Sequence, residues 1–221
     1  MAYRRTENVV RRLAARHAAI IAAAGALAAE AGINAVQIGP VSQRAGIATG
    51  TVYRYFPSKT ELVAALVASV SDRELGAMRR AADAAPGPLS ALAATITTFA
   101  ARALANPRLA FALIAEQADG AADEARLAFR KDLAAELGRR LSTAMNGGHL
   151  PNQDLAVAAP ALLGAVIEGL VGPLAASTGE SAARDAVQAT TLFALRAVGV
   201  ADARARGLVV QANIPARERT G

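Results

Sequence analysis

The sequence predicts an all-α protein, with an N-terminal three-helix helix-turn-helix domain and a larger C-terminal helical domain. Three observations lead to this fold class. Alanine, the residue with the highest helix propensity, makes up 59 of the 221 residues. The chain has no run of alternating, β-branched residues of the kind typical of a strand. Near the N-terminus, a long helical segment precedes two short ones that a glycine separates, which is the order of a helix-turn-helix unit.

The N-terminal helices are predicted from apolar spacing and from their end signals. After a flexible arm at residues 1–10, apolar residues recur at helical spacing from Val10 to Ala31. Two short helices are expected next, at Ile38–Ala45 and Thr49–Tyr55. Gly46 lies between them, and glycine readily adopts the left-handed backbone conformation that ends a helix.

A longer connecting helix is expected after these two. Ser58 and Glu61 have the spacing of a capping box, in which the serine hydroxyl accepts a hydrogen bond from the glutamate amide. The helix continues to about Ala81, and the proline-rich and glycine-rich stretch at residues 85–88 then breaks the chain.

The rest of the chain is predicted to be helical. The expected helices lie at residues 89–105, 107–118, 121–146, 153–176 and 180–203. The expected divisions of the chain are the arm at 1–10, the helix-turn-helix domain at 11–57, the C-terminal domain at 58–203 with its connecting helix at 58–82, and a frayed tail at 204–221.

Positive charge is concentrated in the first third of the chain. Residues 1–73 hold nine Lys and Arg against four Asp and Glu, which accounts for most of the net charge of +6. A local basic excess favours a polyanionic partner, either a nucleic acid or an anionic membrane surface. A solvated charged face is the alternative interpretation.

Several function classes are not favoured. With no cysteine and only two histidines, the chain offers no disulfide, thiolate zinc site or histidine metal cluster. We therefore expect no metal, no cofactor and no catalytic residue. Uncharged stretches such as 17–29 and 155–167 have 13 residues, fewer than the ~18 of a membrane span, so we expect a cytoplasmic protein with no membrane partner.

Aromatic residues are rare, and three of them cluster between positions 53 and 56. Val52 and Phe56 lie four residues apart, so they share the inward face of the second short helix. The hydroxyls of Thr51 and Tyr53 can then donate to phosphate oxygens. Arg54 can contact either a guanine or a phosphate. This helix is therefore expected to enter the major groove of DNA.

These residues also carry a resemblance to a known family. The segment VSQRAGIATGTVYRYFPSKTEL, residues 41–62, and more broadly residues 11–66, resemble the N-terminal domain of the TetR family of transcriptional regulators. The resemblance implies a homodimer that binds a palindromic operator in double-stranded DNA. It also implies a C-terminal domain that binds a small-molecule effector. Ala48 stands where the family commonly has a capping residue.

The resemblance and the residue chemistry together give the expected function, a ligand-responsive transcriptional regulator that represses until a small-molecule effector releases it from DNA. The expected DNA-binding residues are Gln43, Arg44, Thr49, Gly50, Thr51, Tyr53, Arg54, Tyr55 and Lys59. Lys59 lies in the first turn of the connecting helix, where its ammonium and the free amides favour a phosphate.

The C-terminal domain is expected to supply the dimer interface and a largely apolar effector pocket. The interface is expected from the helices at 153–176 and 180–203. The pocket residues are expected to be Phe99, Phe111, Glu116, Phe129 and Glu168, because such a site combines apolar walls with a few polar groups. Two other functions are the alternatives: an enzyme or small-molecule carrier, and a basic protein of the membrane surface.

Overall fold

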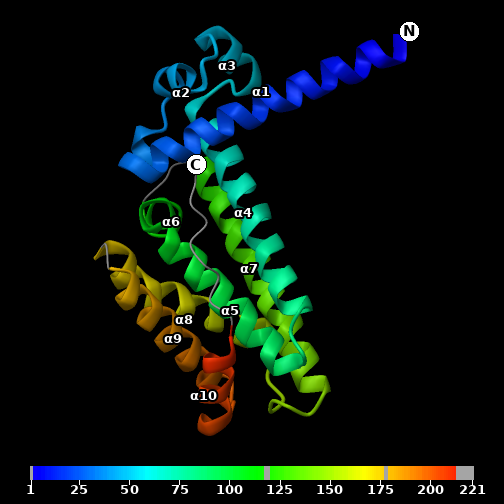
Figure 1. Ribbon diagram of the computed structural model, residues 1–221, viewed down its shortest axis with the longest axis vertical. Helices are drawn as coiled ribbons and strands as arrows, with labels where there is room; N and C mark the ends of the chain where they lie inside the picture. Colours follow the sequence, from blue (N-terminus) through cyan, green and yellow to red (C-terminus); the bar gives the residue numbers. More distant parts are fainter. Residues whose placement is uncertain (1, 117–119, 177–178, 213–221) are drawn as a thin grey trace.

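The structure, a computed structural model, describes residues 2–116, 120–176 and 179–212. Within these residues the chain forms ten α-helices and one short 3-10 helix, and no strand. Figure 1 shows α1, α2 and α3 together at one end of the molecule, with the longer helices of the C-terminal domain extending away from them. The predicted all-α fold with an N-terminal helix-turn-helix domain is confirmed.

The N-terminal domain consists of α1 (Ala2–Ala31), the 3-10 helix η1 (Ile33–Ala35), α2 (Ile38–Ala45) and α3 (Thr49–Tyr55). The bounds of α2 and α3 are those predicted from the sequence. Gly46 ends α2 with a φ of 63°, the left-handed conformation that the sequence predicted. A small apolar core holds these helices together, formed by Ile20, Ala24, Val36, Val41, Val52 and Phe56.

The segment expected to be a flexible arm is instead helical from Ala2 onward, because α1 continues through it. Figure 1 shows this first part of α1 projecting beyond α2 and α3. The cause is local. Between residues 2 and 31 the chain has one glycine and no proline, so no residue interrupts the helical hydrogen bonds.

Helix α4 (Lys59–Asp83) belongs to both domains. Its N-terminus is capped as predicted, since the Ser58 Oγ accepts a hydrogen bond from the Glu61 amide at 3.1 Å. Its contacts run from α1 in the first domain to α5 and α7 in the second. A helix of 25 residues is roughly 37 Å long. One regular element therefore connects the helix-turn-helix end of the molecule to the far end of the C-terminal domain.

The C-terminal domain is a bundle around α5, which packs against α4, α7, α8 and α9. The expected helix at 107–118 is shorter, ending at Ile114, and the one at 153–176 begins at Leu155, where Asp154 caps the Ala156 amide. The other expected helices lie within one residue of their predicted bounds, except the last. The observed helices are α5 (Pro88–Ala105), α6 (Pro107–Ile114), α7 (Ala121–Asn146), α8 (Leu155–Ala175) and α9 (Glu180–Ala197).

The C-terminal end of the described chain differs from the prediction. The expected helix at 180–203 breaks at Gly199, whose φ is 94°, and a separate helix α10 (Asp202–Gln211) follows. Part of the tail expected to fray at 204–221 is therefore folded, while residues 213–221 lie outside the described residues. The prediction failed because it overlooked an apolar stripe on this short helix, formed by the buried residues Ala205, Leu208 and Val209.

A buried carboxylate joins α4 to α7. The side chain of Glu136 is 0% exposed and pairs with the guanidinium groups of Arg79, Arg139 and Arg140. The Arg79 Nε and the Arg140 Nε each lie 2.9 Å from a carboxylate oxygen. A buried charge is costly unless it is paired and hydrogen-bonded, so these three arginines make the burial of Glu136 tolerable.

Three helices of the described chain are long and apolar enough to cross a membrane, judged by length and composition alone. This corrects the expectation from uncharged stretches, which did not allow for the one or two charges that a spanning segment tolerates. The helix at Pro88–Ala105 is α5, more than half buried (56%) in the centre of the bundle. The three segments are Val9–Ala31, Pro88–Ala105 and Leu155–Ala175.

Candidate nucleic-acid interface

Helix α3 has one buried face and one exposed face. Val52 within α3 and Phe56 directly after it are buried, as predicted. The residues on the other face, Thr49, Gly50 and Arg54, are exposed, and the Tyr53 side chain is 51% exposed. Seven residues are too few to be stable alone, so the position of α3 depends on its two apolar anchors.

The three clustered aromatic residues have three different environments. Phe56 is buried, and its ring lies 5.1 Å from that of His17 on α1. Tyr55 is half-buried next to the same histidine, with a ring distance of 6.3 Å, and its hydroxyl donates to the Leu13 carbonyl oxygen at 3.4 Å. Tyr53 is exposed. Of the two tyrosines, therefore, Tyr53 faces solvent and Tyr55 packs α3 against α1.

A hydrogen bond between side chains links α2 to α3. The Ser42 Oγ donates to the Gly39 carbonyl oxygen at 2.7 Å. A hydroxyl has one proton, so the Thr49 Oγ1 must be the donor in its 2.9 Å contact with Ser42. This bond lies at the start of α3, where Ala48 provides no side-chain cap. Thr49 therefore offers a partner molecule acceptor lone pairs and a methyl group.

The two candidate residues on α2, Gln43 and Arg44, differ in whether another side chain already binds them. Gln43 is exposed. Arg44 makes a two-pronged ion pair with Glu30 at the end of α1, with its Nη2 2.7 Å from Oε2. The hydrogen bond from Arg44 lowers the pKa of Glu30, and the same bond raises the pKa of Arg44. A phosphate would therefore have to compete with Glu30 for this guanidinium.

Lys59 and Thr51 complete the set of predicted DNA-binding residues, and both are partly exposed. Lys59 is the first residue of α4, four residues after the end of α3 at Tyr55. The N-terminus of a helix carries a partial positive charge and free amides, so an ammonium there reinforces an anion site. The region around α3 thus combines the hydroxyls of Thr51 and Tyr53, the guanidinium of Arg54 and the ammonium of Lys59, all of which can donate to phosphate oxygens.

Sequence reasoning missed two residues that organise this surface. Ser42 is a buried polar residue, and its only sequence signal was a hydroxyl seven positions before Thr49. Glu30 lies 14 residues before its partner Arg44, so no local pattern could have paired them.

The five residues predicted to line an effector pocket do not come together. Phe99 on α5 and Phe129 on α7 line a common cavity, but its volume is only about 40 Å³. Phe111 is half-buried outside that lining, and Glu168 is exposed on α8. The prediction failed because neighbouring polar and apolar residues on a helix do not reveal which face the helix turns inward.

Glu116, the fifth of these residues, contacts the N-terminal domain instead. Its Oε2 accepts a hydrogen bond from the Ile33 amide of η1 at 2.9 Å. Gly32, with a φ of 83°, leaves room for this carboxylate, since a Cβ at that position would lie 2.7 Å from Glu116 Oε1. Helix α6 also packs on α1. The two domains are therefore linked here as well as through α4.

The first domain of this chain is similar to known regulatory proteins. Residues 20–66 match the sequence model of the family described as bacterial regulatory proteins, tetR family. The HTH-type transcriptional repressor KstR of Rhodococcus jostii is 45% identical over 58 residues, which cover 26% of this chain and 27% of that protein. KstR of Mycolicibacterium smegmatis is 39% identical over 77 residues, or 35% and 38% of the two chains. The matched region thus spans well under half of these curated relatives.

Similarity to solved structures extends over nearly the whole chain. The crystal structure of RolR in complex with resorcinol has a TM-score of 0.70 at 23% identity, covering 95% of this chain and 100% of RolR. The regulator FadR of Bacillus subtilis in complex with stearoyl-CoA also has a TM-score of 0.70, at 20% identity over 82% of this chain and 97% of FadR. Residues 20–66 thus match the tetR family of bacterial regulatory proteins, and the chain as a whole shares its fold with these solved regulators.

Proposed function

We propose that this protein is a ligand-responsive transcriptional repressor that binds operator DNA as a dimer. The observation that carries the proposal is the exposed face of α3, which presents Gly50, Tyr53 and Arg54 while Val52 and Phe56 anchor the helix from behind. A recognition helix enters the major groove in this way. The similarity of this domain to the KstR repressors supports repression.

The residue roles follow from chemistry and exposure. Thr51, Tyr53 and Lys59 bind phosphates, which positions the domain without reading sequence. Gly50 allows close approach to the bases, and Arg54 reads a guanine or neutralises a phosphate. Thr49 meets the DNA as an acceptor, because its proton is donated to Ser42. The remaining predicted residues have smaller parts: Gln43 is a free polar contact, Arg44 is held by Glu30, and Tyr55 supports α3 from α1.

The dimer is proposed to form through α8 and α9. Val157 on α8 is 63% exposed and Phe193 on α9 is 60% exposed, although both side chains are large and apolar. A Cβ added at Gly164 or Gly172 would meet nothing within 4 Å, so these glycines leave the surface of α8 open to close packing. Exposed apolar patches of this kind mark interaction sites. Two half-sites about 34–36 Å apart would then fit the two copies of α3.

The effector is proposed to act through the C-terminal domain. A conformational change on effector binding can reach α3 along α4 and through the contact between Glu116 and Ile33. The coupling in such switches is typically about 1–3 kcal/mol. We further propose that the protein is cytoplasmic and not an enzyme, as befits a DNA-binding regulator similar to transcriptional repressors.

The test begins with selection of bound sequences from a random pool of duplex DNA by the full-length protein. We expect a palindromic consensus. Mobility-shift titration on that consensus should then give a Kd at least tenfold higher for Tyr53→Ala and for Lys59→Ala than for the unchanged protein, because each variant loses a phosphate contact.

The matched control is Arg130→Ala, which removes a positive charge from an exposed position on α7. It should leave the DNA affinity unchanged. Unaltered affinity in both α3-region variants would contradict the proposed interface. Binding to anionic vesicles in preference to the selected duplex at equal ionic strength would instead favour a membrane-surface protein.

A further inference from the structure

The C-terminal domain contains a groove far larger than the cavity between Phe99 and Phe129. This groove lies between α4, α5 and α10 and has a volume of about 560 Å³. Small-molecule sites commonly have volumes of about 300–1,000 Å³. Figure 1 shows that α10 lies at the opposite end of the molecule from α3. The groove is therefore separate from the DNA-facing surface.

Alanine creates the groove. The facing surfaces of two packed helices usually fill the space between them with long side chains, but here six of the 13 lining residues are alanines, whose side chains end at Cβ. The helices remain in contact elsewhere along their length, so the space persists as an apolar trough. The alanines that line the trough are Ala77, Ala81, Ala84, Ala85, Ala94 and Ala212.

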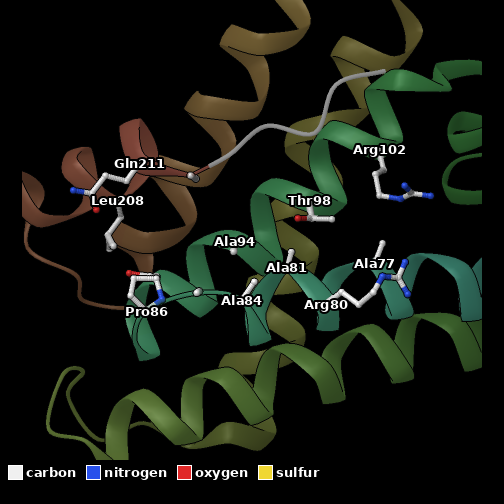
Figure 2. A pocket seen from close by; sticks show the side chains of 13 residues that line it. Ala77, Arg80, Ala81, Ala84, Pro86, Ala94, Thr98, Arg102, Leu208 and Gln211 are labelled. Carbon is white, nitrogen blue, oxygen red and sulfur yellow. The ribbon is translucent and has the colours of Figure 1, made fainter. Parts of the chain in front are cut away.

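The two ends of the groove differ in chemistry. Figure 2 shows Arg80 and Arg102 at one end, and Pro86 and Leu208 at the other, with Thr98 between them. No acidic side chain is among the described residues that line the groove. A molecule lying along the trough would therefore have one end near two guanidinium groups and its body against alanine methyl groups.

Charge counting indicates how many negative charges the basic end can accept. Arg102 is held by Glu74, with its Nε 2.6 Å from Oε2, and both side chains are largely shielded from solvent (20% and 13% exposed). Arg80 makes no ion pair with any residue that the structure describes. Arg73 shares Glu74 with Arg102, so this carboxylate is already occupied. Arg80 is therefore the guanidinium at this end that a ligand with a single negative charge can pair with.

We propose that this groove is the effector site and that it binds an elongated aliphatic molecule ending in a carboxylate. The inference rests on the proposed function and specifies the ligand class of its effector. The carboxylate pairs with Arg80 beside the fixed Arg102 guanidinium, because guanidinium groups bind carboxylates with charge-assisted hydrogen bonds. The aliphatic body lies along the alanines of α4 and α5, where its burial supplies the hydrophobic part of the affinity.

A ligand bound in the groove can also affect DNA binding, through α4. Its walls are α4 and α5, and α4 continues without interruption to Lys59 beside α3. A ligand inserted between the two helices favours whichever spacing of α4 and α5 accommodates it best. It shifts the position of α3 only to the extent that it binds one arrangement more tightly than the other.

The probe for the test is dodecanoate, added below its micelle-forming concentration to the full-length protein and measured by isothermal titration calorimetry. We expect saturable binding with one site per chain. Dodecanol has the same body without the charge and should bind at least tenfold more weakly. Arg80→Gln should weaken dodecanoate binding at least tenfold, as expected when a hydrogen bond between charged groups is lost.

Two further variants isolate the groove. Ala94→Leu fills the trough without changing any charge and should abolish dodecanoate binding, with circular dichroism verifying its fold. Arg130→Gln is the matched control, because Arg130 lines a different groove beside α6 and α7. It should leave dodecanoate binding unchanged.

Three results would overturn the proposal: no dodecanoate binding by the unchanged protein, equal binding of dodecanol, or weaker binding in Arg130→Gln with normal binding in Arg80→Gln. Each leaves the DNA-binding proposal standing if the selected duplex is still bound. Conversely, the protein could bind dodecanoate in the expected pattern and bind no duplex DNA. That result would refute the proposed repressor function and support the proposed ligand site.

Discussion

The two domains differ in how widely the residues of their candidate sites are spread along the sequence. The candidate DNA-contact residues around α3 fall within 43–59, in a stretch that folds by local signals. The groove between α4, α5 and α10 takes its lining from positions 77 to 212. A site of the first kind can be predicted from spacing, whereas a site of the second kind exists only once distant helices have packed.

This contrast has a physical basis in what each site requires of the chain. Around α3 the helix ends are determined by local signals within one or two turns: Gly46 ends α2, and Ser58 caps the start of α4. The groove forms where short alanine side chains leave space between packed helices. Alanine is common throughout this sequence, so the alanines that line the groove cannot be told from the others before the helices pack. Five predictions test the two domains, their junction and the DNA-facing surface, and they run from the largest expected effect to the smallest.

Phe56→Ala should have the largest effect, because it removes the main aromatic anchor of α3. Truncating a buried phenylalanine costs about 3–5 kcal/mol of stability, and here the loss falls on a small core. Chemical denaturation should show the N-terminal domain unfolding first, and DNA binding should be lost. Dodecanoate binding at the groove should survive, since the groove shares no residue with this core.

The control for this variant is Val210→Ala, which shortens an apolar side chain that is 82% exposed. Its stability should change by no more than about 0.5 kcal/mol. Simultaneous loss of DNA binding and dodecanoate binding in Phe56→Ala would show that the two domains fold as one unit, and the contrast drawn above would fail.

Glu136→Ala tests the C-terminal domain in the same way. The substitution leaves a cavity between α4 and α7 and three arginines without their shared partner. Breaking a buried ion pair commonly costs 3–5 kcal/mol, and we expect about 3 kcal/mol because two of these arginines are half-exposed and can be hydrated. Chemical denaturation measures the loss. Glu136→Gln retains the shape and some of the hydrogen bonds, so it should be the milder variant, and the reverse order would contradict this account.

Ser58→Ala tests the junction where the two domains meet. The serine accepts a hydrogen bond from the Glu61 amide, and loss of such a cap typically costs about 1 kcal/mol. The thermal unfolding temperature should fall by a few degrees. Ser58→Asp should restore it, because a carboxylate can accept the same bond and also interacts favourably with the helix dipole. An unchanged midpoint in Ser58→Ala would mean that the cap contributes nothing to α4.

Glu30→Gln should have the smallest effect on stability, and it tests whether Arg44 can contact DNA. Freed from its partner, Arg44 becomes available to a phosphate. The dependence of log K on log salt concentration should steepen by about 0.9 for each added phosphate contact. Mobility shifts over a series of salt concentrations measure this slope. An unchanged slope would mean that Arg44 faces away from the duplex.

The pH dependence of this pair follows from its pKa directions. The pKa of Glu30 is lowered in the folded protein by the hydrogen bond from Arg44. The stabilisation it gives is therefore complete above the range where glutamate ordinarily titrates, and is lost as the pH falls through the depressed value. At neutral pH the pair is intact. The salt slope of the unchanged protein should accordingly be constant between pH 6 and pH 8, as measured by the same titrations.

Sequence reasoning recovered the local structure and missed most of the pairings between distant segments. The bounds of α2 and α3, the left-handed Gly46 and the Ser58 cap all follow from signals a few residues long. The pairing of Arg44 with Glu30 and the role of Glu116 at Ile33 depend on contacts 14 and 83 residues apart. Apolar periodicity predicted where helices occur in the C-terminal domain, but it could not predict which faces meet.

The hydrogen bond between Glu116 and Ile33 has a mechanical consequence. A domain joined to another through a single helix can swivel about the axis of that helix, even when the distance between the two is fixed. The contacts of Glu116 with η1 and of α6 with α1 form a second attachment outside α4, and they restrict this rotation. In both copies of the proposed dimer this attachment would set the rotation of α3 about the α4 axis. Loosening the contacts of Glu116 and α6 with the N-terminal domain would then rotate the two α3 helices relative to the duplex without changing the distance between them.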